Sequence, residues 1–114
     1  MKIIWTDFAA TTLKEIFDYY KENASIAIAR KVKANIFIAT KSLSKNPKSG
    51  QIELNLEKLN EGHRYLVENN YKIVYKQVPE GILITDVFDC RQDPSKINDE
   101  KENPANKFLL AFNC

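Results

Sequence analysis

Residues 64–76 read RYLVENNYKIVYK, and two strands of a sheet can be recognised in them. Tyrosine, valine, leucine and isoleucine dominate the stretch, as is typical of β-strands. Asn69 and Asn70 interrupt it, and asparagine tolerates the positive φ that a tight hairpin turn requires. The stretch therefore predicts an antiparallel hairpin. Alternation divides the side chains of its second strand between two faces, with Tyr71, Ile73 and Tyr75 on one and Lys72, Val74 and Lys76 on the other.

Three further extended segments surround this hairpin. Residues 82–88, ILITDVF, form the most apolar segment, so we expect them in the centre of the sheet. Pro79 and Gly81 predict a turn just before it. Apolar and polar residues alternate over residues 52–56, which predicts a strand or an extended arm. Residues 2–5, KIIW, predict a short strand near the N-terminus.

Two amphipathic helices are predicted between the N-terminal strand and the β-hairpin of residues 64–76. Thr6 and Asp7 can cap the first helix, whose apolar positions recur at steps of three and four residues. Ser25 can cap the second helix, which must end before Pro47 because the residue before a proline is pushed out of the helical region. The apolar positions of the second helix suit an antiparallel helix partner. They are Ala29, Val32, Ile36, Ala39 and Leu43.

The order of these elements, β-α-α-β-β-β, predicts an α+β domain. We expect an N-terminal strand, an antiparallel α-helical hairpin and a mainly antiparallel sheet of three to four strands. The domain is predicted to span residues 1–97. Residues 98–114 form a C-terminal extension whose apolar end, residues 108–112, is expected to dock on this domain or on a second copy of the chain in a homodimer.

Composition narrows the classes of function. A chain of 114 residues fits one domain. No apolar run approaches the roughly 18–20 residues that a membrane-spanning helix needs, so we expect a cytoplasmic protein with no membrane partner. The sequence has no glycine-rich phosphate loop. One histidine and two separated cysteines lack the spacing of a metal site, so neither a metal nor another cofactor is expected.

Positive charge is concentrated in one part of the chain. Six basic residues and no acidic residue lie between positions 30 and 48. Such a run could attract a phosphate backbone or an acidic protein partner. It is also typical of a solvated helix face. The six residues are Arg30, Lys31, Lys33, Lys41, Lys45 and Lys48.

A second group of cations lies on the predicted sheet. Arg64, Lys72 and Arg91 come from three successive strands or their ends, and neighbouring strands lie about 4.8 Å apart. If these side chains share a face, they could converge on a phosphate or a carboxylate. Tyrosines of the same strands could stack on bases. We interpret His63, the single histidine, as a strand-entry residue.

The residues around these cations resemble a known family. The pattern comprises residues 64–67 (RYLV), residues 70–75 (NYKIVY) and residues 82–94 (ILITDVFDCRQDP). Preceded by a strand with Trp5 and by a helical hairpin, it resembles the RelE/ParE superfamily of toxins from bacterial type II toxin–antitoxin (plasmid stabilisation) modules, which serve in stress responses. The resemblance covers residues 1–97 and implies the same β-α-α-β-β-β fold.

The resemblance implies one of two activities. RelE-like members are ribosome-dependent mRNA interferases, endoribonucleases in which cationic side chains hold the phosphate and a general base moves the proton. Lys72 and Arg91 match the cationic positions of that site. Ile97 stands where those nucleases have a tyrosine, which leaves His63 or Asp89 as the base. ParE-like members are not known as enzymes and inhibit DNA gyrase by binding it.

Because Ile97 replaces the tyrosine that transfers the proton in RelE-like nucleases, the resemblance favours a gyrase-binding toxin over an enzyme that acts on the ribosome and mRNA. It also implies a cognate antitoxin. The second helix has more apolar positions than one helix partner needs, so Ile36 and Phe37 are candidate partner contacts. Lys41 and Lys45 would suit an acidic antitoxin segment. Arg64 completes the candidate partner-binding set.

Overall fold

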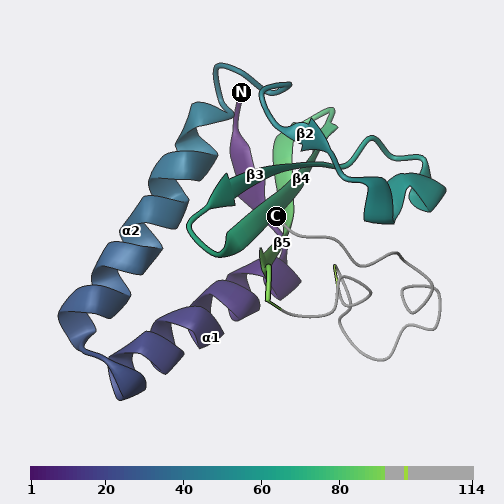
Figure 1. Cartoon of the computed structure of the whole chain (residues 1–114). Helices are drawn as coiled ribbons and strands as arrows, with labels where there is room; N and C mark the ends of the chain where they lie inside the picture. The colour runs from purple at the N-terminus through teal and green to yellow at the C-terminus, as the bar shows by residue number, and fades with distance from the viewer. Residues whose placement is uncertain (92–96, 98–114) are drawn as a thin grey trace.

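The structure, a computed structural model, describes residues 1–91 and residue 97. It consists of two helices on one side of a five-stranded sheet with the strand order β1-β5-β4-β3-β2 (Figure 1). This arrangement confirms the predicted α+β fold. In chain order the elements are β1 (Ile3–Trp5), α1 (Asp7–Asn23), α2 (Ile26–Ser42), β2 (Gln51–Ile52), the 3-10 helix η1 (Leu54–Leu59), β3 (Arg64–Glu68), β4 (Tyr71–Val78) and β5 (Gly81–Asp89).

Both α-helices begin at the predicted caps. Oγ1 of Thr6 accepts a hydrogen bond from the backbone N–H of Ala9 at 3.0 Å. Oγ of Ser25 accepts one from the N–H of Ile28 at 3.1 Å. Each cap satisfies an amide that has no partner within its helix. The helices form the predicted hairpin, which opens as a V away from the short turn between them (Figure 1).

The sheet is antiparallel except at one edge. β3 and β4 are joined through Asn69, which has the expected positive φ of 56°. β4 and β5 are also antiparallel, whereas β1 runs parallel to β5. The prediction that residues 82–88 lie in the centre needs a correction, because β4 is the middle strand and β5 lies between β4 and β1. The short N-terminal strand covers the outer edge of β5.

The prediction of an extended segment over residues 52–56 is wrong after Ile52. β2 has only two residues, and the chain then forms η1. Oε1 of Glu53 accepts a hydrogen bond from the backbone N–H of Asn55 at 3.1 Å, which caps η1. A buried capping carboxylate therefore replaces the strand that the alternating pattern suggested.

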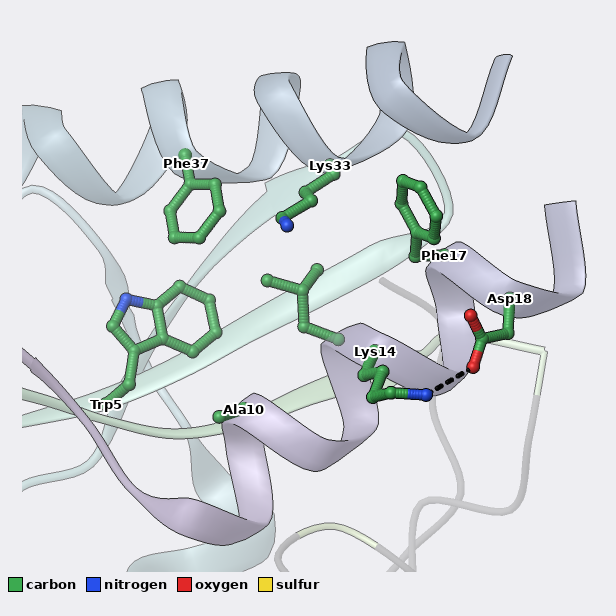
Figure 2. Close-up of a pocket in the computed structure, with 8 residues that line it drawn as sticks. Trp5, Ala10, Lys14, Phe17, Asp18, Lys33 and Phe37 are labelled. Atoms are coloured by element: carbon green, nitrogen blue, oxygen red, sulfur yellow. Dashed lines mark hydrogen bonds and ion pairs between the residues drawn. The ribbon is translucent and has the colours of Figure 1, made fainter. Parts of the chain in front are cut away.

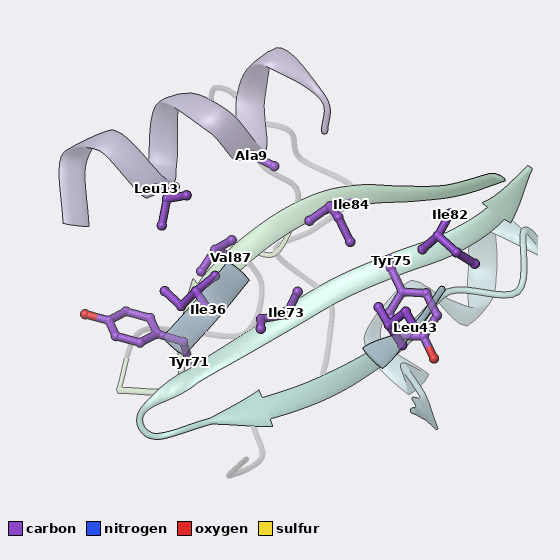
Figure 3. Packing of buried hydrophobic residues seen from close by; sticks show 10 residues of the cluster. All are labelled: Ala9, Leu13, Ile36, Leu43, Tyr71, Ile73, Tyr75, Ile82, Ile84 and Val87. Atoms are coloured by element: carbon purple, nitrogen blue, oxygen red, sulfur yellow. The ribbon is translucent and has the colours of Figure 1, made fainter. Parts of the chain in front are cut away.

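The main hydrophobic core lies between the helical hairpin and the sheet. Figure 3 shows Ala9 and Leu13 of α1 directed toward Ile73 of β4 and Ile84 and Val87 of β5. Ile84 and Val87 could not share a face of a regular strand. They do so because Val74 pairs with Asp86 while Tyr75 pairs with Ile84, which leaves Thr85 as the extra residue of a β-bulge.

A smaller core covers the opposite face of the sheet. Leu56 of η1 and Ile97 pack there against Val74 and Phe88, with Tyr65 beside them. Ile97 is fully buried in this cluster. The sheet is therefore covered on both faces. The predicted extension over residues 98–114, with its apolar end, lies outside the described residues.

Candidate functional site

Lys72, the first candidate phosphate-binding residue, is buried on the sheet face opposite the helices. Its Nζ lies 2.9 Å from Oε2 of Glu53, and the two side chains are 1% and 0% exposed. Nζ also lies 4.3 Å from the ring centroid of Tyr65. Burial lowers the pKa of Lys72, against the opposing effect of Glu53. The ammonium of Lys72 is therefore already paired with a buried carboxylate of the same chain, that of Glu53.

Arg91, the second candidate, lies on the other side of the sheet. Its Nε and Nη2 donate to the two carboxylate oxygens of Asp89 at 3.0 and 2.8 Å. This hydrogen bonding lowers the pKa of Asp89. Asp89 lies opposite Tyr71 in the β4–β5 register, and Tyr71 belongs to the core beneath the helices. Since Tyr71 and Lys72 are adjacent in a strand, their side chains point to opposite faces, and so do the two candidate cations.

His63 is a buried histidine at the start of β3 and does not complete a catalytic site. Its Nε2 lies 3.9 Å from Oε1 of Glu61, and its Nδ1 has no hydrogen-bond partner. Burial, followed by the charge of Lys76, lowers the pKa of His63. Arg64, which follows His63 in the chain, pairs with Tyr75 of β4, whereas Asp89 pairs with Tyr71 near the other end of the same strand. The two candidate bases are therefore separated along the sheet by roughly 15 Å.

These positions do not form a phosphate clamp with a proton-transfer group. Asp89 and Arg91 are brought together, but as an ion pair in which the guanidinium is 62% exposed. Lys72 and His63 are buried elsewhere. Within residues 1–91 and residue 97, the arrangement does not supply a nuclease site, because a base must lie within hydrogen-bond reach of the proton that it removes.

The predicted partner contacts divide into buried and exposed residues. Ile36 is fully buried in the main core, so its prediction as a surface contact is corrected: it supports the hairpin from inside. Arg64 donates from Nη1 to the backbone oxygen of Gly50 at 2.8 Å and holds the segment before β2. Phe37, Lys41 and Lys45 are exposed, as a partner surface requires.

An apolar groove lies between the two helices, with Phe37 on one wall (Figure 2). It has a volume of about 430 Å³. The rings of Phe37 and Trp5 meet edge to face, with centroids 5.4 Å apart. The groove is lined by Trp5, Ala10, Leu13, Lys14, Phe17, Asp18, Lys33 and Phe37.

Lys33 reaches across this groove from α2. Its Nζ lies 5.5 Å from the ring centroid of Phe17 and 5.9 Å from that of Phe37. Lys33 and Lys41 lie one helical turn before and after Phe37, so the aromatic ring is flanked by two cations on the same side of α2. No ion pair between described residues involves any of the six basic residues from Arg30 to Lys48.

The sequence reasoning identified Phe37 but missed the rest of the groove. The sequence places Trp5 in the N-terminal strand and Lys33 in the run of six basic residues, and it gives no sign that both line one groove. The spacing of Lys33 and Phe37 at i and i+4 was the available signal for a mixed aromatic and cationic surface. This spacing could not predict the contact between Trp5 of β1 and Phe37, because that contact depends on how the helical hairpin packs on the sheet.

No group of three or more His, Cys, Asp or Glu side chains is placed to hold a metal ion among residues 1–91 and residue 97. Neither α1 nor α2 is long and apolar enough to cross a membrane.

Comparisons with known proteins agree with this architecture. A family model described as "ParE toxin of type II toxin-antitoxin system, parDE" matches residues 3–94. No curated protein sequence matches the chain. Among solved structures, a chain of the chromosomal ParDE TA system from P. aeruginosa is similar, with a TM-score of 0.66 and 22% identity, over 78% of this chain and 95% of that one.

The family match spans both helices and all five strands, and the structural match shows that the fold is shared. The chain therefore belongs to the ParE toxin family of type II toxin–antitoxin systems, within the RelE/ParE superfamily that its sequence resembles.

Proposed function

We propose that this ParE toxin acts by binding DNA gyrase and holding the enzyme in a state in which cleaved DNA stays unsealed. The partner that neutralises it is a cognate antitoxin. This is a mechanism of protein binding, in which the toxin itself makes and breaks no bond. Family membership supports it, because inhibition of gyrase is the activity that the resemblance to ParE-like toxins implies.

The observation that most directly supports binding over catalysis is the ion pair of Lys72 and Glu53. An mRNA interferase would need Lys72 and Arg91 on one phosphate, whereas Lys72 is 1% exposed, its Nζ is 2.9 Å from a carboxylate oxygen, and Arg91 belongs to the other face. A buried, neutralised ammonium cannot stabilise charge that develops on an external phosphate. The alternative of a RelE-type interferase therefore has no assembled site among the described residues.

The helical hairpin is the surface that we assign to the antitoxin. It combines the groove between α1 and α2 with the exposed cations of α2. Apolar grooves lined by aromatic side chains are a common docking site for amphipathic segments. The excess of positive charge favours an acidic segment.

A paired assay tests the proposal. Purified toxin is added to gyrase with relaxed plasmid, and in parallel to ribosomes carrying a defined message. We expect supercoiling to be blocked, cleaved plasmid to accumulate and the message to stay intact. Adding the antitoxin encoded beside the toxin should restore supercoiling, whereas antitoxin alone should not affect gyrase. Ribosome-dependent cleavage of the message with gyrase unaffected would contradict the proposal and establish the interferase.

A further inference from the structure

The groove between α1 and α2 has apolar walls and a cation at its centre. Trp5, Phe17 and Phe37 supply aromatic surface from three different elements. Figure 2 shows the ammonium of Lys33 between the rings of Phe17 and Phe37. A volume of about 430 Å³ falls within the range of small-ligand pockets, which runs from about 300 to 1,000 Å³. The groove can therefore hold one bulky side chain of a partner.

The charges that line the groove are not equivalent. Asp18 is engaged by Lys14, whose Nζ lies 2.8 Å from Oδ2 of Asp18 within the same helix. Lys33 has no carboxylate partner in the part of the chain that the structure describes. Its ammonium is held only by the faces of two phenyl rings, a weaker interaction than an ion pair with a well-placed carboxylate. Lys33 is thus positioned to accept an anion inside a site whose walls are apolar.

We propose that this groove selects a bulky apolar side chain that lies next to a carboxylate, with Lys33 as the residue that determines specificity. The occupant is an acidic amphipathic segment of a protein partner. That this partner is the antitoxin rests on the proposed function. The apolar side chain fills the space between Trp5, Phe17 and Phe37, and the neighbouring Asp or Glu pairs with Lys33.

The surroundings of the groove favour an acidic occupant over a basic one. Lys41 lies one turn beyond Phe37, and Arg30 lies one turn before Lys33 on the same side of α2. Both are exposed. A segment carrying Lys or Arg at the position next to its apolar side chain would meet three like charges, so the same surface rejects it.

The test uses three small probes that differ only in charge: 3-phenylpropionate, 3-phenylpropan-1-ol and 3-phenylpropylamine. Trp5 is the single tryptophan of the chain and lines the groove, so its fluorescence reports occupancy directly. Each probe is titrated into the purified full-length chain at low ionic strength. We expect the carboxylate to bind about 2- to 5-fold more tightly than the alcohol, as an exposed ion pair allows, and the amine to bind most weakly.

Variants assign the preference to Lys33. Lys33→Gln should bring the carboxylate to the affinity of the alcohol, and Lys33→Glu should make the amine the best probe. Lys48→Gln removes an exposed cation outside the groove and should preserve the original order. Ala10→Phe, which narrows the groove from α1, should weaken all three probes together. Circular dichroism of each variant confirms that the fold is retained.

Equal affinities for the three probes, failure of all three to bind, or an unchanged order in Lys33→Glu would overturn the inference. The assay contains neither gyrase nor antitoxin. Its failure therefore leaves gyrase inhibition standing, and a failure of gyrase inhibition leaves the selectivity of the groove standing.

Discussion

Lys72 depends on Glu53 for its place inside the protein, because an ammonium that is 1% exposed needs a charged partner. Glu53→Gln keeps the shape of the side chain and removes the charge. We expect it to lower the free energy of unfolding by about 3–5 kcal/mol, the usual effect of breaking a buried pair. Urea denaturation measures this change.

The control is a double-mutant cycle with Lys72→Met. Once Lys72 is apolar, Glu53→Gln removes no attraction and should have a much smaller effect than it has in the native chain. Strictly additive effects of the two substitutions would mean that the pair contributes nothing as a pair.

His63 predicts a dependence of stability on pH. Its pKa lies below the ordinary value of about 6.5 because burial and then Lys76 disfavour the charged ring. Between the folded and unfolded pKa values the unfolded chain binds more protons. Stability is therefore full above the ordinary pKa and falls as pH drops through the folded pKa. His63 is the single histidine, so it dominates this range.

The measurement is the free energy of unfolding between pH 7.5 and 5 in the native chain and in His63→Leu. We expect the native chain to lose stability toward pH 5 and the variant to lose clearly less, because leucine does not titrate. Nδ1 of His63 has no partner, so the substitution removes no hydrogen bond at that atom. Parallel pH profiles for the two proteins would show that His63 is not the responsible group.

At the scale of elements, Gly50 sets how the chain passes from α2 to β2. Its N–H donates to Oη of Tyr75 at 2.9 Å, and that hydroxyl donates to the backbone oxygen of Pro47 at 2.9 Å. A Cβ at position 50 would lie 2.5 Å from Oη of Tyr75 and 2.6 Å from the backbone oxygen of Tyr65. The close approach of two strands to this loop therefore requires glycine.

Gly50→Ala should lower the free energy of unfolding by about 1–3 kcal/mol, as overpacking of a core does. Thermal or urea unfolding provides the measurement. Gly62→Asn is the matched control, because position 62 has a φ of 72° but open space around it, and asparagine tolerates that conformation. If Gly50→Ala were no more destabilising than Gly62→Asn, close packing would not be the reason for glycine at position 50.

Local signals predicted most elements of the fold. Thr6 and Ser25 cap the helices as expected, and Asn69 makes the hairpin turn, because each acts on its own neighbouring backbone. The segment after Ile52 was mispredicted since its conformation depends on a distant partner: Glu53 caps η1 while it binds Lys72. Likewise, whether Lys72 and Arg91 share a face depends on strand register and side-chain alternation, which composition alone does not reveal.

At the scale of the whole molecule, the two covered faces of the sheet leave the helical hairpin as the surface for partners. Charge on α2 should then govern binding of the antitoxin. Lys41→Glu and Lys45→Glu are each expected to weaken the antitoxin complex by about threefold at low salt, and less at high salt, because exposed charges are screened. Isothermal titration calorimetry at two ionic strengths measures this.

Lys58→Glu, an exposed substitution on η1, is the control for net charge and should have little effect on the same affinity. Equal affinities of the three variants for the antitoxin would show that charge on α2 does not govern binding. The same conclusion would follow if the loss of affinity in Lys41→Glu and Lys45→Glu were as large at high salt as at low salt.

The parallel pairing of β1 with β5 has a consequence for biosynthesis. Ile3 lies opposite Ile82, so the first strand to emerge from the ribosome must wait for almost the whole domain before it finds its neighbour. Contacts between such distant parts of a chain form late and slowly. A nascent chain therefore cannot complete its sheet until β5 has left the ribosome, so every element between Trp5 and Gly81 is made before the edge strand β1 finds its place.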